Sequence, residues 1–149
     1  MQTSQDRIER KIDIDASAER VWGLISRPGW YINDGAIEDV RVERVGDAHV
    51  VHHPKHGSFP IHTEKLEPPR YAAFRWVPTE GHQNLQTAPS TLVEFWIDEN
   101  ATGGVTLRVV ESGFASLSGT AEDRRKALEG NTEGWETELL VAKKHLEQS

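Results

Sequence analysis

The sequence contains no cysteine, and its 17 lysine and arginine residues are outnumbered by 24 aspartate and glutamate residues. Without cysteine, disulfide bonds, thiolate-ligated metal sites and thiol nucleophiles are excluded. The formal net charge of −7 opposes binding to a phosphate backbone, because that affinity depends on basic side chains that displace counterions. We therefore expect no nucleic acid as a partner.

Long apolar runs are also missing. No stretch approaches the roughly 20 apolar residues that a membrane-spanning helix needs, and residues 1–6 lack the apolar core of a signal peptide. We expect a soluble, cytoplasmic protein without a membrane span. Its aromatic and branched aliphatic residues fall in periodic segments, which is typical of a folded chain. The length of 149 residues predicts one domain over residues 1–149.

Alternating polar and apolar residues predict a first strand over residues 7–15, followed by a short amphipathic helix that Ser17 or Asp15 caps. Arg27-Pro28-Gly29 ends this helix. Residues 36–113 are typical of an antiparallel meander of six strands with short turns. The exception is a 13-residue polar connection from Pro78 to Ser90, long enough to flank an opening.

The last segment predicts a long helix from Thr120, which forms a capping pair with Asp123, to about Leu146. Its apolar seam follows a spacing of three and four residues: Leu128, Thr132, Trp135, Leu139, Ala142 and Leu146. The element order shows no βαβ alternation and therefore predicts an α+β fold.

Four motifs carry a resemblance to a known family: residues 14–22 (IDASAERVW), residues 66–76 (LEPPRYAAFRW), residues 111–114 (ESGF) and residues 131–140 (NTEGWETELL). Together they resemble bacterial homologues of the C-terminal domain of the Hsp90 ATPase activator, within the START-like, SRPBCC or helix-grip superfamily. The resemblance implies a curved antiparallel sheet wrapped around a long C-terminal helix, with two short helices. Members of this superfamily include lipid and sterol carriers, hormone binders, polyketide cyclases and co-chaperone domains, so the fold alone does not select a function.

Strand parity predicts which side chains face the helix. Val93, Phe95 and Ile97 share one face, and Phe74 shares a face with Trp76. In the last strand the parity of Val105, Leu107 and Val109 carries Glu111 inward as well. A buried carboxylate needs a compensating partner. Glu111 is then either a ligand anchor or general acid/base with a raised pKa, or a strand irregularity lets it reach water or an arginine.

The histidines His49, His52, His53, His56 and His62 fall close together in sequence, but consecutive strand residues point to opposite faces. We therefore expect no metal site and no cofactor. Gly130 and Gly134 each weaken the long helix, which predicts a close approach there, to the sheet backbone or to a ligand. Trp96 faces outward, where it is a candidate contact for a protein partner or a second copy.

Three functions remain open. The first is binding of a small hydrophobic or amphipathic molecule between sheet and helix. The second is an enzyme of the cyclase or hydrolase type that uses Glu111, and the third is an interaction module related to chaperone ATPase activation. We expect the first, without catalytic residues. Its candidate ligand-binding residues are Trp30, Phe74, Trp76, Phe95, Glu111, Asn131 and Trp135.

Overall fold

The structure is a computed structural model and describes residues 7–33, 35–37, 41–46, 48–55, 57–76, 90–117 and 120–148. Within these ranges, seven strands form one antiparallel sheet in the order β1-β7-β6-β5-β4-β3-β2. The elements are β1 (Arg7–Ile14), α1 (Ala18–Ile25), β2 (Arg41–Val45), β3 (Ala48–His53), β4 (Gly57–Glu67), β5 (Tyr71–Trp76), β6 (Thr91–Glu99), β7 (Val105–Ser112), the 3-10 helix η1 (Phe114–Ser116) and α2 (Ala121–Glu147).

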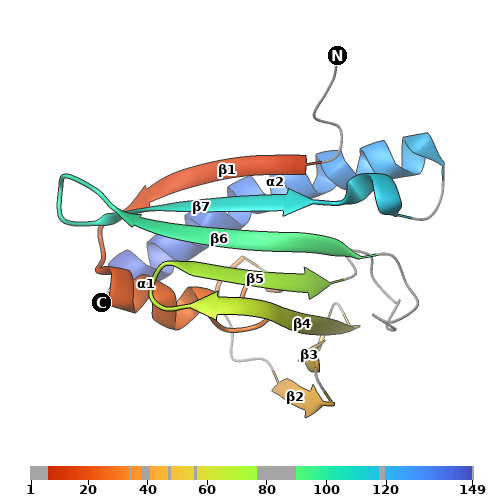
Figure 1. The fold of residues 1–149 in the computed structure, drawn as a ribbon, viewed down its shortest axis with the longest axis horizontal. Coiled ribbons are helices and arrows are strands. Elements are labelled where there is room, and N and C mark those ends of the chain that lie inside the picture. Colours follow the sequence, from red (N-terminus) through yellow and green to blue (C-terminus); the bar gives the residue numbers. More distant parts are fainter. Residues whose placement is uncertain are drawn as a thin grey trace.

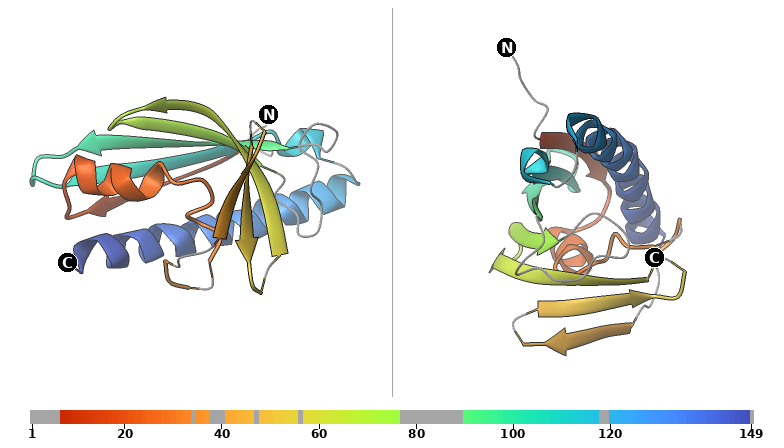
Figure 2. Two further views of the ribbon diagram at one scale, coloured as in Figure 1. Left: turned by 90° about the horizontal axis from the view of Figure 1, so that it is seen from below. Right: turned by 90° about the vertical axis from the view of Figure 1, so that its right-hand side faces the viewer.

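The sheet curves, and α2 lies along its concave side (Figures 1 and 2). This arrangement confirms the predicted α+β helix-grip fold, with α1 and η1 as the short helices. The expected six-strand meander corresponds to β2–β7. Its long connection falls almost entirely on residues 77–89, which lie outside the described residues, as does His56. Among the described helices, none is both long and apolar enough to cross a bilayer.

Strand parity orders the core. Val93, Phe95 and Ile97 of β6 are buried, and so are Val105, Leu107 and Val109 of β7. These two neighbouring strands place their apolar faces on the same side of the sheet, because successive residues alternate between the faces. The helix seam meets this face through Trp135, Leu139, Ala142 and Leu146, all of them buried. The core therefore follows the two periodicities of the sequence.

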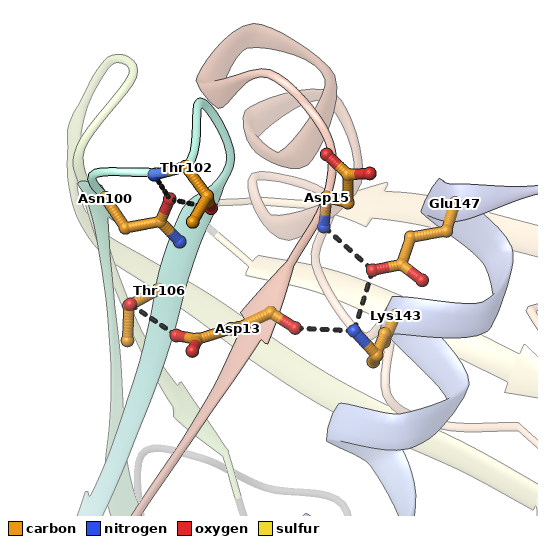
Figure 3. A network of polar contacts seen from close by, with 7 residues as sticks. All are labelled: Asp13, Asp15, Asn100, Thr102, Thr106, Lys143 and Glu147. Carbon is orange, nitrogen blue, oxygen red and sulfur yellow. Dashed lines mark hydrogen bonds and ion pairs between the residues drawn. The ribbon is translucent and has the colours of Figure 1, made fainter.

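Both ends of α2 are fixed by polar contacts. At the N-terminal end, Thr120 and Asp123 form the predicted capping box. Near the C-terminal end, Lys143 donates to the carbonyl oxygen of Asp13 at 2.8 Å, and the Glu147 carboxylate accepts from the Asp15 backbone N–H at 2.8 Å (Figure 3). These contacts join the helix to the end of β1 and so hold its register against the sheet.

Candidate functional site

Glu111 is fully buried and lies at the centre of a cluster of hydrogen bonds. Its Oε1 accepts from Asn131 Nδ2 at 3.1 Å and from Trp135 Nε1 at 2.8 Å. Its Oε2 accepts from Trp76 Nε1 at 3.0 Å and from Thr91 Oγ1 at 2.5 Å. Every one of the four donors is uncharged.

The register of three strands and one helix brings these residues together. Trp76 of β5 pairs with Thr91 of β6, and Glu111 of β7 pairs with Val93, two residues further along β6. Residues two apart on a strand share a face, so these three polar side chains stand beside one another. From the other side, Asn131 and Trp135 are four residues apart on α2 and therefore share one face of the helix.

The predicted inward orientation of Glu111 is thus observed, but its surroundings differ from both expected partners. The sequence left open a contact with an arginine or with water. Glu111 is instead 0% exposed, and within the described part of the chain its hydrogen bonds come from two indoles, an amide and a hydroxyl. Two donors on each oxygen replace the water that the carboxylate loses on burial.

Trp30 and Tyr31 enter the space between sheet and helix from the turn that follows α1. Gly29 permits this entry, because its φ of 74° lies in the left-handed region and a Cβ there would come within 2.5 Å of Val51 Cγ2. The Tyr31 ring centroid lies 5.0 Å from those of Trp76 and of Trp135. The Trp30 ring centroid lies 5.6 Å from that of Phe95. These two residues therefore occupy much of the space in which the sequence predicts a cavity.

A cavity of about 130 Å³ remains next to the Glu111 cluster. It is bordered by Tyr31, Trp76, Asn131, Gly134, Trp135 and Glu138. Three of these residues, Trp76, Asn131 and Trp135, also donate to Glu111. The cavity and the buried carboxylate therefore share part of their structure.

Two groups at the cavity have unusual environments. The Tyr31 hydroxyl is buried and has no hydrogen-bond partner among the described residues. Burial raises the pKa of Tyr31 well above its usual value, and the nearby charge of Glu111 adds to this, so the hydroxyl keeps its proton. Burial also raises the pKa of Glu138 to about 7, against the opposing effect of the bond of 2.7 Å that Asn33 Nδ2 donates to it.

The prediction that Gly130 and Gly134 allow the sheet backbone to approach α2 closely is wrong. Among the described residues, a Cβ at Gly130 or at Gly134 would meet no atom within 4 Å outside the helix's own nearby backbone. Packing against the described strands therefore does not offset the stability that each glycine costs within a helix. Gly134 borders the cavity, where the absence of a side chain leaves space open.

The remaining predicted ligand-binding residues lie deeper in the core. Phe74 and Phe95 are fully buried, and their ring centroids are 6.3 Å apart. Phe95 also packs against Trp135, with 5.7 Å between ring centroids. Trp30 is buried, and its Nε1 has no partner among the described residues. Of the seven predicted residues, Trp76, Asn131 and Trp135 border the cavity, and Glu111 is bonded to all three.

The sequence interpretation missed Tyr31, Thr91, Gly134 as a cavity residue, and Glu138. Parity would have placed Thr91 on the face of Val93 and Phe95. Helical spacing would have placed Glu138 on the face of Trp135, three residues earlier. Tyr31 lies in an irregular turn without periodicity, so no pattern in the sequence indicates that it points inward.

The histidines of β3 and β4 form separate contacts. His52 bonds to Ser58 Oγ at 2.8 Å and to Glu43 at 3.1 Å, whereas His53 Nδ1 accepts from the backbone N–H of Lys55. Across the described ranges, no group of three or more histidine, aspartate or glutamate side chains is arranged to hold a metal ion.

On the outer face of the sheet, Trp96 is partly exposed, as parity predicted. The guanidinium carbon of Arg108 lies 4.2 Å from the centroid of its ring, and the Tyr71 ring centroid is 5.2 Å away. Elsewhere, a wider hollow of about 550 Å³ lies against the outer side of α2, bordered by Ile37, Leu140 and Lys144 among others. It contains no cluster comparable to that of Glu111.

Comparison with known proteins places this architecture in a family. Residues 15–147 match the family model described as activator of Hsp90 ATPase homolog 1-like protein. A search of curated proteins finds no match.

Several solved structures share the fold. Protein MLL2253 from Mesorhizobium loti is 17% identical, with a TM-score of 0.68 over 96% of this chain and 98% of that one. XoxI from Bacillus cereus is 12% identical, with a TM-score of 0.69 over 95% of each chain. A structure titled as the Aha1 dimer from Colwellia psychrerythraea is 19% identical, with a TM-score of 0.64 over 95% of this chain and 96% of that one. The family match and the fold agree with the resemblance in the sequence, and the chain belongs to the activator of Hsp90 ATPase homolog 1-like family.

Proposed function

We propose that this protein binds a small amphipathic molecule whose head group enters the cavity between Tyr31, Trp76 and Trp135. The observation that carries the proposal is the cavity itself, which is walled by three aromatic rings and by Gly134, a helical glycine beside which no described residue packs. Ligand sites are mostly apolar with a few polar groups that fix orientation, and this cavity has that composition.

The polar groups at the cavity support a ligand with a polar end. Asn131 and Glu138 border it from the helix side, where their amide and carboxyl groups offer polar contacts to a ligand.

The size of the cavity limits what enters. A volume of about 130 Å³ is close to the roughly 150 Å³ of an apolar protein cavity that accepts benzene. Sites for larger, drug-sized ligands measure about 300–1,000 Å³. The rings of Trp30, Phe74 and Phe95 therefore support the wall, and a ligand group about the size of benzene fits without moving them.

The test is a titration with phenol and benzyl alcohol, read by tryptophan fluorescence, because two tryptophans border the cavity. We expect a saturable change for the native protein. Gly134→Leu should abolish it, since the new side chain extends into the open space. Gly130→Leu is the matched control one turn earlier, where a Cβ likewise meets none of the described residues and where the position does not border the cavity.

Equal responses from the two leucine variants, or no response from the native protein to either compound, would contradict the proposal. The enzyme alternative has less support, because each oxygen of Glu111 already accepts two hydrogen bonds, so little of the carboxylate is free to take a substrate proton.

A protein partner or second copy at the outer face near Trp96 is a second candidate. It is favoured by the partly exposed ring of Trp96 and by the relative that is titled as a dimer. Light scattering of the native protein and of Trp96→Ala tests it: a dimer that the variant loses would support this contact, and a native monomer would exclude a stable second copy.

A further inference from the structure

We propose that the cavity selects ligands that carry a positively charged organic ammonium head. This inference rests on the proposed function and specifies the chemistry of its ligand. It follows from the charges around the cavity and from its aromatic walls.

The first observation is that Glu111 brings a carboxylate into the core without a basic partner. Its four bonds come from uncharged donors, and the described residues include no lysine, arginine or histidine in an ion pair with it. Hydrogen bonds from neutral groups spread this negative charge but do not cancel it. Three of the residues that surround the charge also border the cavity, which places the cavity in a negative field.

A second carboxyl group borders the cavity directly. Glu138 is partly buried on α2 and borders the cavity together with Tyr31 and Trp76, and Asn33 Nδ2 donates a hydrogen bond to it. None of the described residues that border the cavity is basic. Burial of Glu138 raises its pKa to about 7, which is the response of a carboxyl group that lacks a counterion.

The walls are suited to a cation. Tyr31, Trp76 and Trp135 border the cavity, and the Tyr31 ring lies 5.0 Å from each of the two indoles. Aromatic rings attract organic cations electrostatically, and tryptophan does so most strongly. Quaternary ammonium groups are recognised in this way because they are apolar at the surface yet charged.

The experiment compares choline with dimethylbutanol, its neutral carbon isostere, by calorimetry and tryptophan fluorescence at low ionic strength. The two compounds have nearly the same shape, so their difference reports the charge. We expect choline to bind about tenfold more tightly or better. Its affinity should also rise as the pH increases from about 5 to about 8, because the cation favours the ionised form of Glu138 and competes with its proton.

Glu138→Gln keeps the shape and the acceptor for Asn33 but removes the charge. We expect this variant to lose most of the preference for choline, together with the pH dependence, while dimethylbutanol binds as before. Glu133→Gln, an exposed change on the same helix, is the matched control and should leave all three readouts unchanged.

The outcomes separate the inference from the proposed function. If dimethylbutanol binds as tightly as choline, the cation preference is wrong and the cavity still binds a small amphipathic molecule. If neither choline nor dimethylbutanol binds, and phenol and benzyl alcohol fail too, both are wrong. If choline is preferred but Glu138→Gln changes neither the preference nor the pH profile, the assigned role of Glu138 is overturned.

Discussion

At the scale of single residues, Glu111 organises the interior. One carboxylate on β7 fixes two indole N–H groups, an amide and a hydroxyl, which come from β5, β6 and α2. Each of these donors would otherwise need its own partner in a dry environment. The four hydrogen bonds offset the free energy that burial of the carboxylate costs, and they also satisfy four polar groups. They join α2 to the sheet at a defined position.

Glu111→Gln should destabilise the protein strongly. Each oxygen of Glu111 accepts two hydrogen bonds, so either orientation of the new amide places its NH₂ group against two donors. These two donors then lose their acceptor. We expect a loss of about 2–4 kcal/mol in the free energy of unfolding, measured by urea denaturation. The control is Glu99→Gln at the exposed end of β6, with a change within about 0.5 kcal/mol. Equal stability of the two variants would show that the hydrogen bonds to Glu111 contribute little.

Glu138 should make stability depend on pH in a defined direction. Its pKa in the folded state is about 7, above its ordinary value of 4.5, so the folded state holds the proton more tightly. The contribution of Glu138 to the free energy of unfolding is therefore most favourable below about pH 4.5, and it is lost as the pH rises through about 7. After allowance for the partial exposure of Glu138, Glu138→Gln should raise the free energy of unfolding by about 1–2 kcal/mol above pH 7 and change it little near pH 4. Urea denaturation of the native protein and of Glu138→Gln across this pH range tests the prediction. An equal gain in stability at all pH values would contradict it.

At the scale of elements, the sequence predicted what depends on periodicity. The alternation in β6 and β7 predicted which side chains face the helix, including that of Glu111, and the apolar seam of α2 predicted that Trp135 is buried. The partners of Glu111 could not be predicted in this way, because they depend on the register of β5, β6 and β7 and on the placement of α2. Tyr31 could not be predicted either, since the turn after α1 repeats no pattern. Its entry depends on Gly29, because a Cβ at this position would collide with Val51.

The two glycines of α2 lead to a prediction about this helix. Gly130→Ala should raise the free energy of unfolding by about 0.5–1 kcal/mol, because alanine is the better helix former and its Cβ meets nothing within 4 Å. The same substitution at Gly29 should destabilise, since φ is 74° and the new Cβ would collide with Val51. Urea denaturation of both variants checks the pair. A loss of stability for Gly130→Ala would mean that the helix packs more closely there than the structure shows.

At the scale of the whole molecule, the sheet is unevenly anchored. β7 lies between β1 and β6, and Val105, Leu107 and Val109 are fully buried. β2 lies at the opposite edge of the sheet, all five of its residues are exposed, and it pairs only with β3 among the described strands. Figure 2 shows β2 and β3 on the side of the molecule away from β1 and β7. The core formed by β6, β7 and α2 should therefore open last.

Amide hydrogen exchange should reveal this gradient. Protection follows the free energy of the opening that exposes each amide, which ranges from near zero at frayed edges to the global free energy of unfolding in the core. Amides of β2 that bond to β3 should therefore exchange about 100-fold faster or more than those of β7, because releasing β2 exposes no buried side chain of its own. Exchange followed by NMR resolves the individual amides, and β4 should fall between the two because part of it is buried. Uniform protection from β2 to β7 would show instead that the sheet opens as one unit, with the edge hairpin as firmly held as the strands that carry Glu111 and its donors.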